Sequence, residues 1–277
     1  MSFGEKDKPL TITVPFGEGN MTLTFIASGF SVGLLVGLTG VGGGSLMTPI
    51  LTLIFGVSPT VAVGTDLAFA SLTKVTGTVA HRLQNNIRWE IVKYLSMGAL
   101  PAAAIATFAL QQIGTVNQDI GRFIRYSIAV SILLTVTSIV FRSRMIAWLD
   151  AHPEKQLQGK SLAAATIVAG AVLGTLVTIS SIGAGAIGST ILILLYPRLK
   201  PAEVAGTDIA YAVPLTTIAA LGHWWLGTIN WELLATLLIG SVPGIILGSF
   251  IARIIPALAL RALLATALTG VAVKLVY

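Results

Sequence analysis

The stretch SPTVAVGTDLA at residues 58–68 returns as KPAEVAGTDIA at residues 200–210, an offset of 142 residues. Each copy has a proline near its start and a Gly-Thr-Asp triplet near its end. Further pairs of uncommon residues obey the same offset: Gly43 and Gly185, His81 and His223, Trp89-Glu90 and Trp231-Glu232, Gly98 and Gly240, and Pro101 and Pro243. A constant offset without a gap predicts an internal duplication, so we expect two copies of one folding unit.

The composition is that of a membrane protein. Of the 277 residues, 55% are hydrophobic and only 10% are charged, and the mean hydropathy is +0.88. Soluble globular chains carry about 25% charged residues because their surface faces water. The net charge of +6 comes from basic residues scattered between apolar blocks, which excludes the basic stripe of a nucleic-acid-binding protein. The lipid bilayer is therefore the expected partner of most of the surface.

Metal, thiol and nucleotide chemistry have little support in the sequence. The chain has no cysteine, and three dispersed histidines do not form a metal-binding pattern. Gly183, Gly185 and Gly188 match the spacing of a dinucleotide-binding loop, but they lie inside apolar segments instead of following a strand. We therefore expect neither a metal nor a cofactor.

Ten apolar blocks follow one another along the chain. About twenty apolar residues cross the hydrocarbon core as a helix, and eight blocks reach that length. The second and seventh blocks are short and flanked by glycine, which predicts broken or re-entrant helices. The blocks lie at about 21–39, 44–57, 59–80, 89–110, 120–141, 162–181, 186–197, 201–222, 231–252 and 256–277. This pattern predicts an all-α polytopic membrane protein with two repeats of about five helical segments each.

The longest hydrophilic stretch divides the chain near its middle. We expect a polar N-terminal tail at 1–20, a first membrane repeat at 21–141, a cytoplasmic linker at 142–160 and a second membrane repeat at 161–277. The tail lacks the basic start, apolar run and small-residue cleavage site of a signal peptide.

The distribution of basic residues predicts that the two repeats have opposite orientations in the membrane. Residues 81–93 carry three lysines or arginines, whereas the equivalent residues 223–235 carry none. Conversely, residues 198–200 carry two, whereas residues 56–58 carry none; only the arginines within 122–125 depart from the pattern. Because basic loops stay in the cytoplasm, we predict inverted repeats with both chain termini outside the cell.

Two glycine-rich breaks form the first part of a candidate site. Residues 39–45 read TGVGGGS, and residues 180–186 read SSIGAGA. Paired broken helices in inverted repeats are typical of transporter binding sites, and free amides at a following helix N-terminus favour an anion. The residues expected to contact substrate here are Gly40, Gly42, Gly43, Gly44, Ser45, Ser181, Gly183 and Gly185. The alternative is that the glycines only permit close helix packing.

Charged and hydroxyl side chains near the Gly-Thr-Asp triplets form the second part. A carboxylate inside a membrane is costly, so Asp66 and Asp208 are candidates for proton coupling; otherwise they make helix-packing hydrogen bonds. Thr65 and Thr207 either donate hydrogen bonds to the substrate or bond back to their own helix. Lys74 lies about 80° from Asp66 around an ideal helix, so it either shares their cavity and binds substrate or snorkels to the surface.

These residues resemble the TauE/SafE sulfite-exporter family. The resemblance rests on GVGGG at 40–44, Pro49, Ser58-Pro59 and Gly64-Thr65, and it covers nearly the whole chain after residue 20. It implies movement of sulfite, sulfoacetate, other organosulfonates or related small anions along a path between the two halves. The second glycine segment, within 184–191, lacks some of these glycines and the proline, so a site built from both halves is expected to be lopsided.

Together these features predict a secondary transporter that exports a sulfur-containing anion across the prokaryotic cytoplasmic (inner) membrane by alternating access. No nucleotide-binding motif is present, so a gradient, most simply of protons, is expected to drive it. The alternative is a passive anion channel with the same site. An intramembrane hydrolase with Ser45 as nucleophile and His81 as base is disfavoured because Ile187 replaces Ser45 in the repeat. We therefore expect no enzyme; the oligomeric state does not follow from the sequence.

Overall fold

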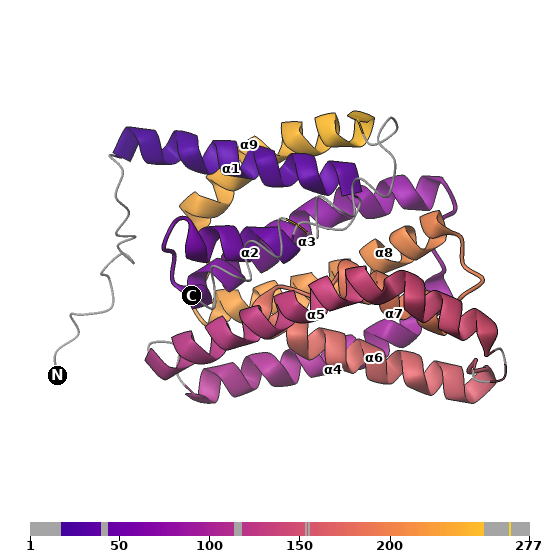
Figure 1. Ribbon diagram of the computed structural model, residues 1–277. Coiled ribbons are helices and arrows are strands. Elements are labelled where there is room, and N and C mark those ends of the chain that lie inside the picture. The colour runs from indigo at the N-terminus through magenta and orange to yellow at the C-terminus, as the bar shows by residue number, and fades with distance from the viewer. Residues whose placement is uncertain are drawn as a thin grey trace.

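The computed structural model describes residues 18–39, 44–113, 118–152, 154, 156–251 and 266 of the chain. Within these ranges the chain forms a bundle of α-helices without a strand, as Figure 1 shows. The helices are α1 (Glu18–Thr39), α2 (Gly44–Leu53), α3 (Pro59–Leu83), α4 (Trp89–Ile113), α5 (Gln118–Ala151), α6 (Gly159–Ser180), α7 (Ala186–Leu195), α8 (Pro201–Trp225) and α9 (Trp231–Ile251). The predicted all-α architecture is confirmed.

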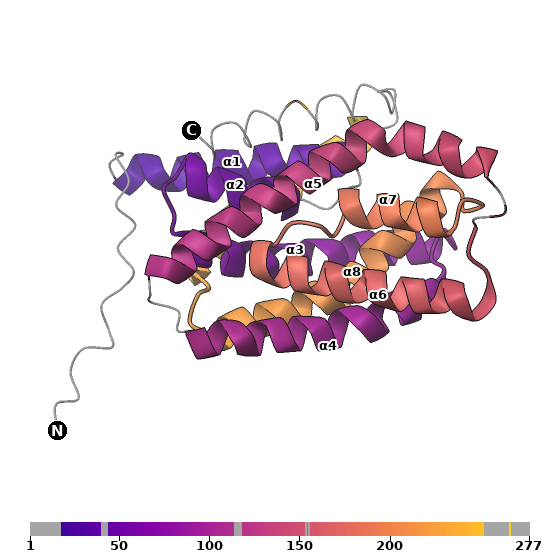
Figure 2. The same ribbon diagram turned by 60° about the horizontal axis from the view of Figure 1, so that its bottom comes forward.

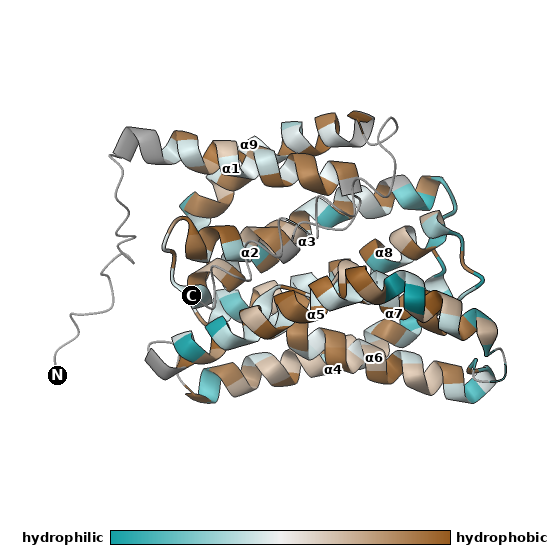
Figure 3. Ribbon diagram, in the orientation of Figure 1, coloured by the Kyte–Doolittle hydropathy of each residue, from teal (hydrophilic) through white to brown (hydrophobic). Residues whose placement is uncertain are grey.

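The outer surface of the bundle is apolar. In the described parts of the chain, five helical segments are long and apolar enough to cross a membrane, namely Trp89–Ile113, Ile120–Ala151, Gly159–Ser180, Pro201–Trp225 and Trp231–Gly248. Large hydrophobic side chains such as Ile105 and Trp225 have more than 60% of their surface exposed, and much of the length of the helices is hydrophobic in Figure 3. Soluble monomers rarely expose contiguous apolar surface on this scale. The prediction of a polytopic membrane protein is confirmed.

Helix bounds in the two halves correspond at the 142-residue offset. Helices α2 and α7 each have ten residues, and α3 and α8 each have 25. Both α3 and α8 begin at a proline, which is favoured in the first turn because its missing N–H has no partner there. Both α4 and α9 begin at a Trp-Glu pair. The last predicted block, 256–277, lies outside the described residues except for Thr266.

Helices of the two halves are packed reciprocally. Helix α1 of the first half runs beside α9 of the second, and α6 of the second half runs beside α4 of the first (Figure 1). At Gly29 and Gly33 in α1, an added Cβ would collide with the backbone of α9. At Gly170 and Gly174 in α6, it would collide with the backbone of α4. Small residues thus allow the close helix approach on which packing in membranes depends.

Helices α3 and α8 cross at the centre in an antiparallel manner. The hydroxyls of Ser71 and Thr217 are 2.8 Å apart. Further along α3, Gly77 faces Ile209, which comes earlier in α8. Positions that rise along one helix therefore meet positions that fall along the other. Equivalent helices of two inverted repeats are expected to run antiparallel, as α3 and α8 do. The side of the membrane on which each loop lies stays a prediction.

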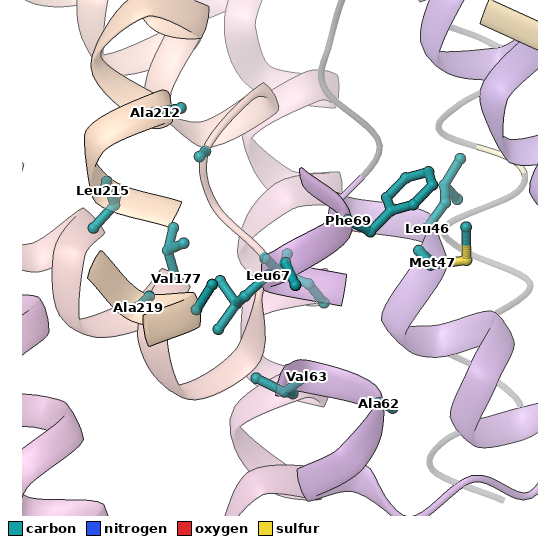
Figure 4. Packing of buried hydrophobic residues seen from close by; sticks show 14 of the residues in the cluster. Leu46, Met47, Ala62, Val63, Leu67, Phe69, Val177, Ala212, Leu215 and Ala219 are labelled. Carbon is teal, nitrogen blue, oxygen red and sulfur yellow. The ribbon is translucent and has the colours of Figure 1, made fainter. Parts of the chain in front are cut away.

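The bundle core fills the space between these central helices. Figure 4 shows apolar side chains of α2, α3, α6 and α8, among them Met47, Leu67, Val177 and Leu215, which are all fully buried. Helix α5 lies across α6 and α7 on one side of this core (Figure 2).

Helix α5 is longer than the sequence blocks predict. It continues through residues 142–151, which were expected to belong to the cytoplasmic linker. Two local contacts favour this extension: the Arg144 guanidinium lies 5.5 Å from the centre of the Phe141 ring, and His152 Nδ1 lies 2.9 Å from the carbonyl oxygen of Trp148. Charged residues at a helix end do not stop a helix when their stems can pack against it. At the other end of the repeat, α1 already begins at Glu18.

Candidate functional site

The second glycine segment forms a buried break between α6 and α7. Helix α6 ends at Ser180, and Ser181 adopts a left-handed conformation with φ of 58°. Gly183 and Gly185 follow with φ of 131° and 135°, a region that is open to glycine and strained for other residues. Helix α7 then begins at Ala186. The break predicted before the seventh segment is therefore present, and the first residues of α7, among them Ala186 and Gly188, are buried.

The first glycine segment is described only at its two ends. Helix α1 ends at Thr39, and α2 begins with Gly44 and Ser45. Gly40, Gly42 and Gly43 lie outside the described residues, so their predicted substrate contacts stay predictions.

Lys74 extends from α3 of the first repeat into the break of the second. Its side chain is buried, and Nζ donates a hydrogen bond of 3.3 Å to the carbonyl oxygen of Ala184. It also interacts electrostatically with Asp66 and Asp208. The burial of this lysine disagrees with snorkelling to the surface, and substrate binding by Lys74 stays a prediction.

Asp66 is tied to the short helix α2. Thr48 donates two hydrogen bonds to Asp66 Oδ2, one from its hydroxyl at 2.6 Å and one from its backbone amide at 3.2 Å. The other carboxylate oxygen, Oδ1, is buried without a hydrogen-bond partner. Sequence reasoning did not identify Thr48, because a threonine inside an apolar helix usually bonds back to its own backbone.

Asp208 has a different environment. It accepts no hydrogen bond from the described residues, and its Oδ1 is buried without a partner. Lys74 and Arg142 are the cations that act on it. A Cβ added to Gly188 in α7 would meet Asp208 Oδ1 and the hydroxyl of Tyr211, which is also buried and unpartnered. Tyr211 was not predicted; the signal for it is that the equivalent residue of the first repeat is a phenylalanine.

Unpartnered polar atoms gather around Lys74. Buried side-chain atoms without a hydrogen bond include Asp66 Oδ1, Ser181 Oγ, Asp208 Oδ1 and the Tyr211 hydroxyl. Ser181 is close enough to Asp66 to interact with its carboxylate. Each such atom costs about 1 to 3 kcal/mol when it is left unpaired, and native proteins normally satisfy such groups. This cluster thus offers an ammonium, two hydroxyls and two acids to a small polar ligand.

Thr65 and Thr207 connect the two repeats in the same way. The Thr65 hydroxyl accepts a hydrogen bond of 3.1 Å from the amide of Asn230. The Thr207 hydroxyl accepts one of 3.0 Å from the amide of Arg88. Each Gly-Thr pair therefore docks on the turn that precedes the fourth helix of the other half. Hydrogen bonding of either threonine to substrate stays a prediction.

A cavity of about 510 Å³ opens beside the start of α8. Arg88, Arg198 and Glu203 contribute its charged lining, and the Arg88 guanidinium pairs with the Glu203 carboxylate. This end of the molecule carries the basic loops predicted to lie in the cytoplasm. Exposed arginines around a concave surface raise the local concentration of anions.

Comparison with known proteins supports a transport role. Residues 25–275 match the family described as sulfite exporter TauE/SafE. The chain is 36% identical over 229 residues to the probable membrane transporter protein YjnA of Bacillus subtilis (strain 168), covering 83% of this chain and 89% of that protein. The probable membrane transporter protein YdhB of the same strain is 24% identical over 236 residues, 84% of this chain and 91% of that protein. No solved structure matches the chain.

Proposed function

The chain belongs to the TauE/SafE sulfite-exporter family of membrane transporters, and on that premise we propose that it exports sulfite, sulfoacetate or another small organosulfonate by alternating access. The family description supports the sulfur-containing anion, and the names of the relatives support membrane transport. We place the protein in the prokaryotic cytoplasmic (inner) membrane with both termini outside, because its basic loops then face the cytoplasm.

The main observation in favour of an anionic substrate is the position of Lys74. It is a buried cation whose ammonium group reaches the broken segment between α6 and α7. An ammonium has three donors, and only the Ala184 carbonyl accepts one of them among the described residues. The break adds the N-terminal end of α7, which favours negative charge. An oxyanion of sulfur satisfies both groups.

The location of this lysine also supports alternating access. Lys74 belongs to the first repeat, whereas its hydrogen-bond acceptor belongs to the second. A substrate held between them touches both repeats, so rocking one repeat against the other opens the site to either side in turn.

Coupling to protons follows from the two acids. Asp66 and Asp208 both interact with Lys74, and an anion that enters their cluster meets two negative charges when both are ionised. Protonation of one acid leaves a single negative charge and so weakens this repulsion. We therefore propose that a proton accompanies the anion through the transport cycle.

The test is flux into proteoliposomes. Sulfite, sulfoacetate and thiosulfate uptake are measured with and without a pH gradient, for the native chain, for Lys74→Met and for Lys93→Met as a matched control on the exposed surface of α4. We expect saturable, gradient-dependent flux of at least one anion, lost in Lys74→Met and kept in Lys93→Met. Flux that ignores the gradient indicates a passive channel, and no flux of the three anions removes the support for this substrate class.

The proposed inverted orientation is tested by labelling. The chain has no cysteine, so single cysteines at Gln84 and Leu226, equivalent positions in the two repeats, react without background. An impermeant thiol reagent is expected to label one position from outside the cell and the other only after the membrane is opened. Labelling of both from the same side contradicts inversion.

A further inference from the structure

Asp66 holds a neighbouring helix in place. Both the hydroxyl and the amide of Thr48 in α2 donate to the same carboxylate oxygen, at 2.6 and 3.2 Å. Hydrogen bonds to a carboxylate are among the stronger ones in proteins. Helix α2 has only ten residues, and this pair of bonds attaches it to α3 in addition to the packing of Met47 and Leu51 in the core.

Asp208 lacks the equivalent attachment. Thr190 of α7 corresponds to Thr48, but its hydroxyl bonds back to the carbonyl of Ala186 at 2.9 Å. No described residue donates a hydrogen bond to Asp208. The two aspartates therefore occupy equivalent positions in the repeats but differ in their hydrogen bonds to the short helices.

The surroundings of the two acids differ in the same sense. Leu46 in α2 and Phe69 in α3 make the first repeat apolar at this level, and Figure 4 shows Phe69 beside Leu46. The corresponding residues of the second repeat are Gly188 and Tyr211. Asp208 Oδ1 and the Tyr211 hydroxyl both lie within 3.0 Å of the point that a Cβ of Gly188 would occupy. A carboxylate oxygen and a hydroxyl therefore lie beside Gly188 in the second repeat, where the first repeat has the hydrocarbon side chains of Leu46 and Phe69.

Few charged or titratable groups face Asp208. Lys74 of α3 and Arg142 of α5 act on it, Tyr211 lies on its own helix, and Asp66 reaches it only through the shared Lys74. Helix α7 has no charged residue. No acidic or basic group of the described parts of α4 and α6 acts on it. The balance of charge in this cluster therefore changes when Asp208 gains or loses a proton.

From these contacts we propose that Asp208 alone carries the proton exchanged during transport, with the Tyr211 hydroxyl close by, whereas Asp66 is the structural latch of α2. The proposal rests on the proposed function, because it divides the work of a proton-coupled anion site between the two aspartates.

Charge balance explains the coupling. When Asp208 is ionised, its negative charge attracts the positive charges of Lys74 and Arg142. When the carboxylate binds a proton from water on one side, Lys74 no longer faces its negative charge, and a substrate anion binds there instead. Release of the proton on the other side restores the ion cluster and expels the anion. The proton and anion move in the same direction, so export requires an anion gradient large enough to exceed any opposing proton gradient.

The proton carrier is identified without any substrate by infrared difference spectroscopy. The full chain in lipid nanodiscs is titrated with acid, and the carboxylic-acid carbonyl bands are followed. We expect a buried titrating band in the native protein and in Asp66→Asn, and its loss in Asp208→Asn. A band that disappears in Asp66→Asn and persists in Asp208→Asn overturns the proposal, as does the absence of any buried titrating band.

Flux measurements give the second arm. With an anion that the native protein transports, Asp208→Asn is expected to keep anion–anion exchange and to lose accumulation driven by a pH gradient, down to the level of empty liposomes. Thr48→Val, which removes the hydroxyl bond between α2 and Asp66 and leaves both acids in place, is expected to yield less folded protein but to keep gradient-driven accumulation per folded molecule. The reverse pattern contradicts the proposal. If no anion is transported by the native protein, the proposed function fails, while the infrared titration still decides which aspartate binds the proton.

Discussion

The two repeats of this transporter keep the same backbone plan and differ in chemistry at equivalent positions. In the first repeat, Thr48 binds Asp66, and hydrocarbon fills the space beside it. In the second, no described residue donates a hydrogen bond to Asp208, and its Oδ1 and the Tyr211 hydroxyl both lie beside Gly188. The backbone plan needs both copies, because each repeat packs on helices of the other. The duplicated helices thus form the scaffold, and the proposed proton site lies where the two repeats differ in side chains.

The largest effect is expected from adding a methyl group next to Asp208 in the second repeat. In Gly188→Ala the new methyl group collides with Asp208 Oδ1, so gradient-driven flux falls to the level of empty liposomes while the protein stays in the membrane. Gly121→Ala in α5 is the matched control, because a Cβ there has nothing within 4 Å. Full flux in Gly188→Ala is incompatible with a functional role for Asp208.

Placing the polar group of the second repeat into the first is expected to destabilise the fold. Phe69→Tyr buries a hydroxyl among apolar residues, which costs about 1 to 3 kcal/mol. Tyr211→Phe removes a hydroxyl that has no hydrogen-bond partner, so it is expected to cost less. Reversible unfolding in mixed detergent–SDS micelles measures both free energies. If the two substitutions lower the free energy of unfolding equally, the proposed difference in polarity between the repeats is wrong.

The latch of α2 is tested with a pair of identical substitutions. Thr48→Val removes the hydroxyl bond to Asp66, and hydrogen bonds between membrane helices are worth about 0.6 to 1.7 kcal/mol. Thr190→Val removes only a bond within α7, so we expect a smaller loss in the free energy of unfolding. If Thr190→Val is as costly as Thr48→Val, the two aspartates do not differ in their attachment to the short helices.

The smallest difference is expected where the repeats are alike. Thr65→Val and Thr207→Val each remove one hydroxyl acceptor of a backbone amide between the repeats. Each is expected to cost about 0.6 kcal/mol, and the two values are expected to agree within the error of SDS unfolding. A loss of flux in one variant with unchanged stability indicates a direct substrate contact at that threonine.

Much of the fold could be predicted from the sequence, because its signals are local. Proline at residues 59 and 201 marks the start of two helices, and the short second and seventh blocks became α2 and α7. Lys74 was identified because a buried cation stands out in an apolar block. By contrast, the extension of α5 through 142–151 depends on how charged side chains pack, which a pattern of apolar blocks does not contain.

The polar neighbours of the acids could not be derived in the same way. Thr48, Gly188 and Tyr211 each have an ordinary packing role in an isolated helix. Their importance arises from tertiary contacts with Asp66 and Asp208. A comparison of the repeats at the 142-residue offset reveals the exchange of Phe69 for Tyr211, but only the structure brings that hydroxyl next to a carboxylate.

The most direct test of Asp208 as the proton carrier is the number of protons taken up for each anion bound. Isothermal titration calorimetry of the native protein, Asp66→Asn and Asp208→Asn, in buffers with different ionisation enthalpies, gives this number from the change in heat. We expect about one proton per anion in the native protein and in Asp66→Asn, and none in Asp208→Asn. Anion binding without proton uptake in the native protein, or proton uptake that survives in Asp208→Asn, contradicts the account.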